Sequence, residues 1–280
     1  MGAYRGFIVW GAGIVLVLGA FLIFVAAGWP GAENNCVHDK PNSCYCEAFN
    51  LSDVVKGTPG VRQPVNTWFN LYSIVTSLVV ALVVYSDRKS GDSTNLIRRS
   101  DSLVPDLYIF AVLFLGLGSM WFHGSLKEWG GVTDMLSMFV FAAFLVFYTT
   151  RRLWDSELFF WLGYVGTVVL FTIVGEAWQW KFQSLILILI LVAAYLVFEV
   201  MIWVRSGKVM QGKPLTILLW VLAVVAIISA TIFWALSQTG GPLCDPQSAF
   251  QPHGLLWHPL AGVMAVLLYF YWREDTYSSA

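Results

Sequence analysis

The chain has 280 residues, of which 58% are hydrophobic and 12% are charged, and its mean hydropathy is +0.70. This composition excludes an ordinary soluble domain and indicates an integral membrane protein with several spans. The formal net charge of −1 gives no basic or acidic excess, so we expect no nucleic-acid partner.

Apolar runs between polar breaks predict eight membrane-spanning helices. Each run has roughly 18 to 25 residues, enough to cross about 30 Å of hydrocarbon. The runs lie near residues 6–28, 66–86, 106–126, 131–150, 157–176, 182–204, 214–236 and 254–273. We therefore expect an all-α membrane protein, with a seven-transmembrane helix bundle over residues 66–275 and one additional N-terminal transmembrane helix within residues 1–30.

The first span has a second interpretation. Arg5 followed by an apolar run that ends in FVAAG also resembles a cleaved signal peptide. The run is longer than the roughly 7 to 15 residues usual in signal peptides, and GWPGAE matches a cleavage site poorly. We expect this segment to be retained as a helix, which could act as a signal anchor.

Basic residues are distributed unequally between the predicted loops. If the N-terminus is cytoplasmic, the inner loops hold 11 Lys and Arg residues and the outer loops hold 5, as the positive-inside rule favours. Eight spans then leave both termini in the cytoplasm. The loop over residues 31–65 is expected on the extracytoplasmic side, which is periplasmic, lumenal or extracellular.

All four cysteines, Cys36, Cys44, Cys46 and Cys244, fall in two loops that the charge count places outside. An oxidising compartment would let them form two disulfide bonds, one of which could join the 31–65 loop to the 237–253 loop. A metal cluster built on the CYC motif is the alternative, although the paired CxxC spacing of such clusters is absent.

Five polar side chains fall at the outer ends of predicted spans, where such groups are unfavourable unless they face a cavity, a metal or a partner. Ser119 and His123 are four residues apart, so they lie about 40° apart on one helix face and about 6 Å apart along its axis. Asp134 begins the next span at the same depth, and His253 and His258 open the last one. Three imidazoles with an open fourth position suit a catalytic zinc, and a carboxylate beside them can take a proton from water.

Each of these residues also has an ordinary explanation when it is taken alone. A histidine at a membrane interface is commonly a hydrogen-bonding residue, Asp134 could cap its helix, and Ser119 could belong to close helix packing. Their common depth favours a site. Glu199 lies near the inner end of its span, so we expect it to snorkel or to pair with Arg205.

The segment GLGSMWFHGSLKEWGGVTDMLSM resembles the conserved segment of alkaline ceramidases, whose superfamily of seven-span membrane hydrolases includes the adiponectin and progestin receptors and the Per1 lipid-remodelling enzymes. The family pattern of Ser-x3-His, an Asp and a final His pair reads here as Ser119, His123, Asp134, His253 and His258. The resemblance covers about residues 44–275. It implies zinc on the three histidines, Asp134 as base and acid, Ser119 at the oxyanion, and ceramide or a related acyl lipid as substrate. Beyond substrate and membrane lipids we infer no obligate protein partner.

Two loop motifs extend the resemblance. CYCE before NTWFNLYSIV and GPLCD before the last span resemble family segments, which implies a Cys46–Cys244 disulfide and leaves Cys36 to Cys44. Some family members hold calcium near the zinc. Glu47 matches one of its acidic ligands, whereas Thr67 stands where another acid is expected, so the resemblance implies Ca²⁺ only in part.

The last two histidines depart from the family spacing. HGLLWH is His-x4-His rather than the usual His-x3-His, so an ideal α-helix would set His253 about 140° from His258 instead of about 40°. Pro252 indicates a helix start at which His253 could occupy an unwound cap, and a π-bulge at GLL would also bring the two residues together.

Other functions fit the same residues. An ester-cleaving lipid hydrolase of the same superfamily would use the same site, whereas a lipid-binding receptor would hold a structural zinc with Asp134 as a fourth ligand. A transporter is a further alternative, against which the lack of broken inverted repeats counts.

Overall fold

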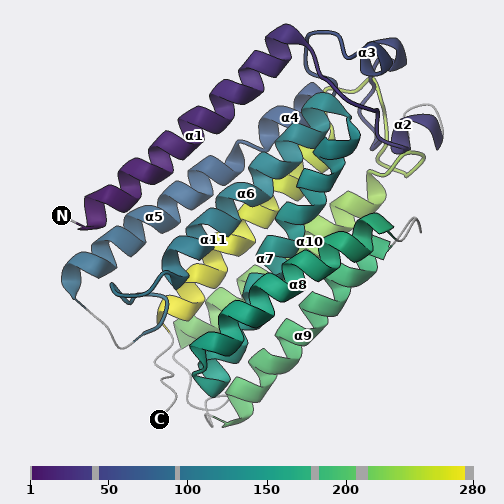
Figure 1. Ribbon diagram of the computed structural model, residues 1–280. Helices are drawn as coiled ribbons and strands as arrows, with labels where there is room; N and C mark the ends of the chain where they lie inside the picture. The colour runs from purple at the N-terminus through teal and green to yellow at the C-terminus, as the bar shows by residue number, and fades with distance from the viewer. Residues whose placement is uncertain (1, 40–43, 92–94, 178–182, 206–213, 275–280) are drawn as a thin grey trace.

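The computed structural model describes residues 2–39, 44–91, 95–177, 183–205 and 214–274, and most of them are helical (Figure 1). Within these residues, eight helical segments are long and apolar enough to cross a membrane, and they coincide with the eight predicted spans. The prediction of an all-α membrane protein is therefore confirmed. The elements are α1 (Gly2–Ala27), α2 (Cys36–Asp39), α3 (Leu51–Lys56), α4 (Pro64–Phe69), α5 (Tyr72–Ser90), α6 (Val104–Ser125), α7 (Glu128–Trp154), α8 (Glu157–Ala177), α9 (Gln183–Arg205), α10 (Pro214–Leu236), the π-helix η1 (His253–Trp257) and α11 (His258–Glu274).

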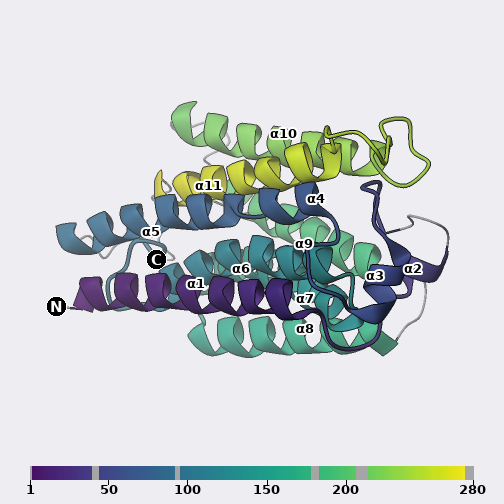
Figure 2. The same cartoon turned by 90° about the horizontal axis from the view of Figure 1, so that it is seen from above.

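The long helices run side by side in one bundle (Figures 1 and 2). The α6 span is the most buried of the eight, with 67% of an apolar 18-residue stretch inside the protein, whereas such stretches of the α1 and α8 spans are each only 11% buried. Short α4 and long α5 form one span, broken at Asn70, and η1 with α11 forms another. We call the end that carries α2, α3, α4 and η1 the loop end. The first residue of α1 and the last of α11 lie at the opposite end.

Glycine brings α6 and α7 into close contact near the loop end. A Cβ atom at Gly118 would lie 2.7 Å from the Ser137 Cβ and 2.8 Å from the Thr133 carbonyl oxygen, so no larger residue fits without a shift. Small residues allow helix backbones to approach in this way inside membranes. The contact sets Ser119, the residue after Gly118, beside the first turns of α7.

Helix α1 is fixed to the bundle mainly at the loop end. Phe21 is fully buried, and its ring occupies the space that a Cβ at Gly124 would need. The backbone N–H of Trp29 donates to the Gly57 carbonyl at 2.8 Å, and its indole N–H donates to the Gly60 carbonyl at 2.7 Å. The additional helix is thus joined to the chain segment that leads into α4.

A buried ion pair lies at the opposite end of the bundle. The Arg152 guanidinium donates to both carboxylate oxygens of Glu199 at 3.0 and 2.9 Å, and the Tyr271 hydroxyl also donates to this carboxylate. The predicted snorkelling or pairing of Glu199 with Arg205 is therefore wrong. The physical reason is that α7 packs against α9 and places an arginine of another helix beside Glu199.

Candidate metal centre

The final histidine pair is brought together by a π-helical turn. Element η1 begins at His253, directly after its N-cap Pro252, and ends at Trp257, so His258 starts the regular helix α11. Residues five apart share a face in a π-helix because its hydrogen bonds connect residues i and i+5. Of the two geometries considered from the sequence, the structure has the π-helical one.

Three buried histidines from α6, η1 and α11 converge at the loop end. One potential ligand atom from each of His123, His253 and His258 lies within 4.8 Å of the other two. The Nε2 atoms of His123 and His253 are 3.3 Å apart. Two nitrogen ligands of a tetrahedral zinc, each about 2.0–2.1 Å from the metal, are also separated by about 3.3 Å. The donor set and its spacing therefore fit zinc.

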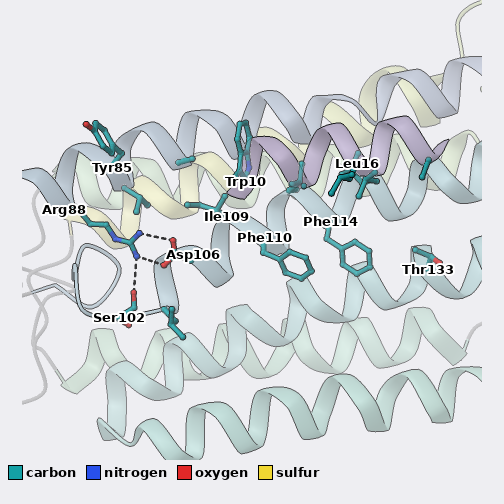
Figure 3. A pocket seen from close by; sticks show the side chains of 18 of the residues that line it. Trp10, Leu16, Tyr85, Arg88, Ser102, Asp106, Ile109, Phe110, Phe114 and Thr133 are labelled. Carbon is teal, nitrogen blue, oxygen red and sulfur yellow. Dashed lines mark hydrogen bonds and ion pairs between the residues drawn. The ribbon is translucent and has the colours of Figure 1, made fainter. Parts of the chain in front are cut away.

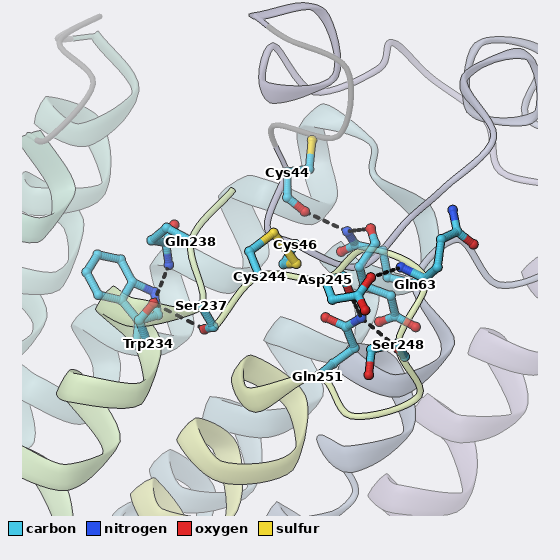
Figure 4. Close-up of a disulfide and its surroundings, with 12 residues drawn as sticks. Cys44, Cys46, Gln63, Trp234, Ser237, Gln238, Cys244, Asp245, Ser248 and Gln251 are labelled. Atoms are coloured by element: carbon cyan, nitrogen blue, oxygen red, sulfur yellow. Dashed lines mark hydrogen bonds between the residues drawn. A yellow bond between two sulfur atoms is a disulfide. The ribbon is translucent and has the colours of Figure 1, made fainter. Parts of the chain in front are cut away.

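Gln63 orients the first of these histidines. Its side-chain oxygen lies 2.7 Å from Nδ1 of His123, so this nitrogen carries the proton and Nε2 is left unprotonated. The Gln63 amide in turn donates to the carbonyl oxygens of Cys44 at 2.6 Å and Glu47 at 2.9 Å (Figure 4). Such a partner on the second ring nitrogen is the usual support of a metal-binding histidine.

Ser119 on α6 and Asp134 on α7 lie next to each other beside the histidines. The Asn70 amide, at the break between α4 and α5, donates to the Ser119 hydroxyl at 3.2 Å and lies 3.4 Å from Nε2 of His258. The Asn70 side-chain oxygen is buried and has no hydrogen-bond partner among the described residues. Five predicted site residues thus gather at one point, together with an asparagine.

Glu47 lies close to this centre but acts as a cap in the described structure. Its two carboxylate oxygens accept the backbone N–H groups of Val65 at 2.7 Å and Asn66 at 2.8 Å, at the start of α4. Burial raises the pKa of this carboxyl, and the two N–H donors partly offset that effect. The implied calcium site gains no support, because both oxygens already have donors and Thr67 offers no charge.

All four cysteines form disulfide bonds, Cys36 with Cys44 and Cys46 with Cys244, the second of which is drawn in Figure 4. The alternative metal cluster on the CYC motif is excluded because no cysteine is free. Tyr45 lies between the two bonds, and its ring contacts His253.

A large apolar cavity lies away from the three histidines. It has a volume of about 1320 Å³ between α1, α5 and α6, and none of the predicted site residues lines it (Figure 3). Arg88 and Asp106 form an ion pair at one end, while Thr133 lines the other. Leu16 and Phe110 on its walls are 73% and 51% exposed, so this groove opens to the lipid side of the bundle. Convergent polar groups, rather than cavity volume, therefore define the site.

Comparison with models of protein families matches residues 57–276 to the family described as Ceramidase. The chain belongs to the ceramidase family. Comparison with curated proteins gives no match. Membership of the ceramidase family implies a hydrolase that acts on the amide bond of ceramide. The matched range begins after α3, so α1 and the CYC motif precede it, whereas the three histidines, Ser119 and Asp134 lie inside it.

Sequence reasoning missed three residues of this centre: Gln63, Asn70 and Tyr45. The two amides are uncharged, so neither stood out as an unfavourable group at membrane depth. Tyr45 is an ordinary aromatic residue in a loop. The only signal for it was its place between two cysteines.

Proposed function

We propose that this chain is a zinc-dependent amidohydrolase that cleaves the N-acyl bond of ceramide or a related lipid amide to a fatty acid and a sphingoid base. The observation that carries the proposal is the convergence of three buried histidines beside Ser119 and Asp134 in a member of the ceramidase family. His123, His253 and His258 would hold the zinc.

Zinc in this position would acidify a water molecule and polarise the amide carbonyl. Asp134 would accept the proton from that water and pass it to the leaving nitrogen, so that the C–N bond breaks with a neutral amine as the leaving group. The water oxygen ends in the fatty acid. Burial of Asp134 favours this role because few competing waters surround it.

Ser119 would bind the oxygen that becomes negative in the transition state. The Asn70 amide donates to the serine oxygen at 3.2 Å, so it orients the hydroxyl and leaves the hydroxyl proton free for the oxyanion. Preorganised donors of this kind stabilise developing charge because they need not reorient during the reaction.

The arrangement supports hydrolysis over a receptor with a structural zinc. The group of converging ligand atoms contains three histidines, and Asp134 is not among them. A structural zinc normally has four protein ligands, whereas a catalytic zinc keeps one position for water or substrate. Asp134 would then stay off the metal and be available for proton transfer.

We further propose that the centre faces the extracytoplasmic side and that both termini are cytoplasmic. The excess of basic residues at the opposite end and the disulfide bonds at the loop end both support this orientation.

The test is release of fatty acid and sphingoid base from a panel of ceramides, measured by mass spectrometry with the purified chain. Parallel samples carry Asp134→Asn or a zinc chelator, and a parallel panel contains ester lipids. Release by the untreated wild type alone supports the proposal. Zinc retention with cleavage of esters only would reassign the substrate, and zinc retention without any cleavage would favour a receptor.

A further inference from the structure

The histidines of the metal centre are not supported in the same way. Nδ1 of His123 has Gln63 as its hydrogen-bond partner, whereas Nδ1 of His253 is buried and has no partner among the described residues. Metal-binding histidines usually donate this second N–H to an acceptor, which fixes the ring. His253 therefore needs another restraint on the rotation of its ring.

An aromatic ring lies directly against His253. The centroids of Tyr45 and His253 are 4.1 Å apart and their planes meet at 28°, which is a stacked arrangement. The same tyrosine lies 5.0 Å from the ring of His123, at a tilt of 56°. The Trp257 ring lies on a nearly parallel plane 6.5 Å from His253. Of these two stacked rings, Tyr45 is much the closer, so it limits how far the imidazole can turn.

Tyr45 is itself held on both sides along the backbone. Cys44 on one side is bonded to Cys36. Cys46 on the other side is bonded to Cys244 (Figure 4). Tyr45 has a φ of +67°, a left-handed conformation that side chains other than glycine rarely adopt. Such backbone persists only where the surrounding structure imposes it.

We propose that Tyr45 is a positioning residue of the metal centre, whose ring, clamped between two disulfide bonds, holds His253 in the orientation that faces His123 and His258. This role rests on the proposed zinc function. It also assigns a purpose to the CYC motif, which precedes the range matched by the ceramidase family model. Disulfide formation in the loop then contributes to metal binding without supplying a ligand.

The test measures zinc affinity of the purified full-length chain by competition with a chromogenic chelator, and the visible spectrum of the cobalt-substituted chain. Tyr45→Leu removes the stacked ring and should weaken zinc binding about tenfold, which is the lower end of the range seen when a supporting contact of a metal ligand is lost. The same variant should also change the cobalt spectrum. Tyr45→Phe keeps the ring and should retain wild-type values for both. Phe49→Leu removes a ring from the same loop that makes no described ring contact with a histidine, and it should also match wild type.

Wild-type zinc affinity and an unchanged cobalt spectrum in Tyr45→Leu would overturn the positioning role while leaving the proposed function intact. Absence of metal binding by the wild type would overturn both. If Tyr45→Leu loses its helical circular dichroism, the double variant Cys36→Ser/Cys44→Ser decides, because it keeps every ring and releases one clamp. Weaker zinc binding in that variant supports the role of the clamp, and unchanged binding overturns it.

Discussion

The two ends of the bundle each contain a buried polar cluster, and the clusters differ in how their groups are paired. At the opposite end, Arg152 and Glu199 form an ion pair, and the Tyr271 hydroxyl donates a further hydrogen bond to Glu199. At the loop end, ligand nitrogens of His123, His253 and His258 converge within 4.8 Å of one another, and the Asn70 side-chain oxygen is buried without a described partner. Buried polar groups are normally satisfied by the protein, so unsatisfied atoms that converge indicate the place of a ligand. A saturated cluster indicates a structural role.

The largest expected effect that tests this distinction is on turnover. Asp134→Asn should lower kcat for ceramide about 10²- to 10⁴-fold, because the amide cannot accept and return the proton. Zinc content and melting temperature should stay at wild-type values, since Asn keeps the shape of the side chain. The matched control is Asp155→Asn at the other end of α7, where the carboxylate is exposed. Wild-type turnover in Asp134→Asn would refute the catalytic assignment.

Changes at the opposite end should act on stability instead. Glu199→Ala leaves Arg152 buried without its counter-charge, which should reduce the free energy of unfolding by about 3–5 kcal/mol. Turnover by the folded fraction should be unchanged. The double variant Arg152→Met/Glu199→Leu removes both charges and should regain most of the lost stability in detergent unfolding curves. A loss of turnover in this folded double variant would show that the ion pair also serves the reaction.

A smaller effect is expected at the serine. Ser119→Ala removes one hydrogen bond to the developing oxyanion and should lower kcat about 10²- to 10³-fold, with zinc affinity retained. Ser77→Ala serves as the control, because Ser77 is also a buried serine in a spanning helix and its hydroxyl donates to the Ile74 carbonyl. Equal kcat values for the two alanine variants would contradict the assignment of Ser119.

The smallest of these effects concerns Gln63. Gln63→Leu removes the acceptor for Nδ1 of His123 and should weaken zinc binding about 10- to 100-fold in a chelator competition. Excess zinc should restore much of the turnover, since the ligands themselves remain. Gln238→Leu, which breaks a side-chain bond to the Trp234 carbonyl at the same end, is the control and should bind zinc normally. Unaltered affinity in Gln63→Leu would show that His123 needs no such support.

The sequence was sufficient for the spans because hydrophobic length and charge are local properties of a segment. It was also sufficient to place Ser119, His123 and Asp134 at one depth, since helix geometry converts spacing into position. It did not predict which helices are neighbours. Glu199 was therefore paired with the nearby Arg205, whereas its actual partner is 47 residues away in α7.

The supporting contacts of the site were beyond sequence reasoning for the same reason. Gln63 is 60 residues from His123, and Asn70 is 49 residues from Ser119, so only the packing of α4 against α6 reveals them. The sequence left the backbone geometry at His253 undecided for a different reason. Pro252 is compatible with a plain helix start, and the choice between backbone geometries depends on the neighbours of the turn.

The Cys46–Cys244 bond joins residues 198 positions apart and so closes a covalent ring that contains α3 through α10. A single peptide-bond cut in any loop of this ring opens the circle but releases no fragment, and the cut chain remains one molecule until the disulfide is reduced. The element η1, with His253, emerges from the ring shortly after the point of closure. The covalent ring thus keeps the segments that carry His123 and His253 close together. The surrounding lipid contributes little to this association of helices.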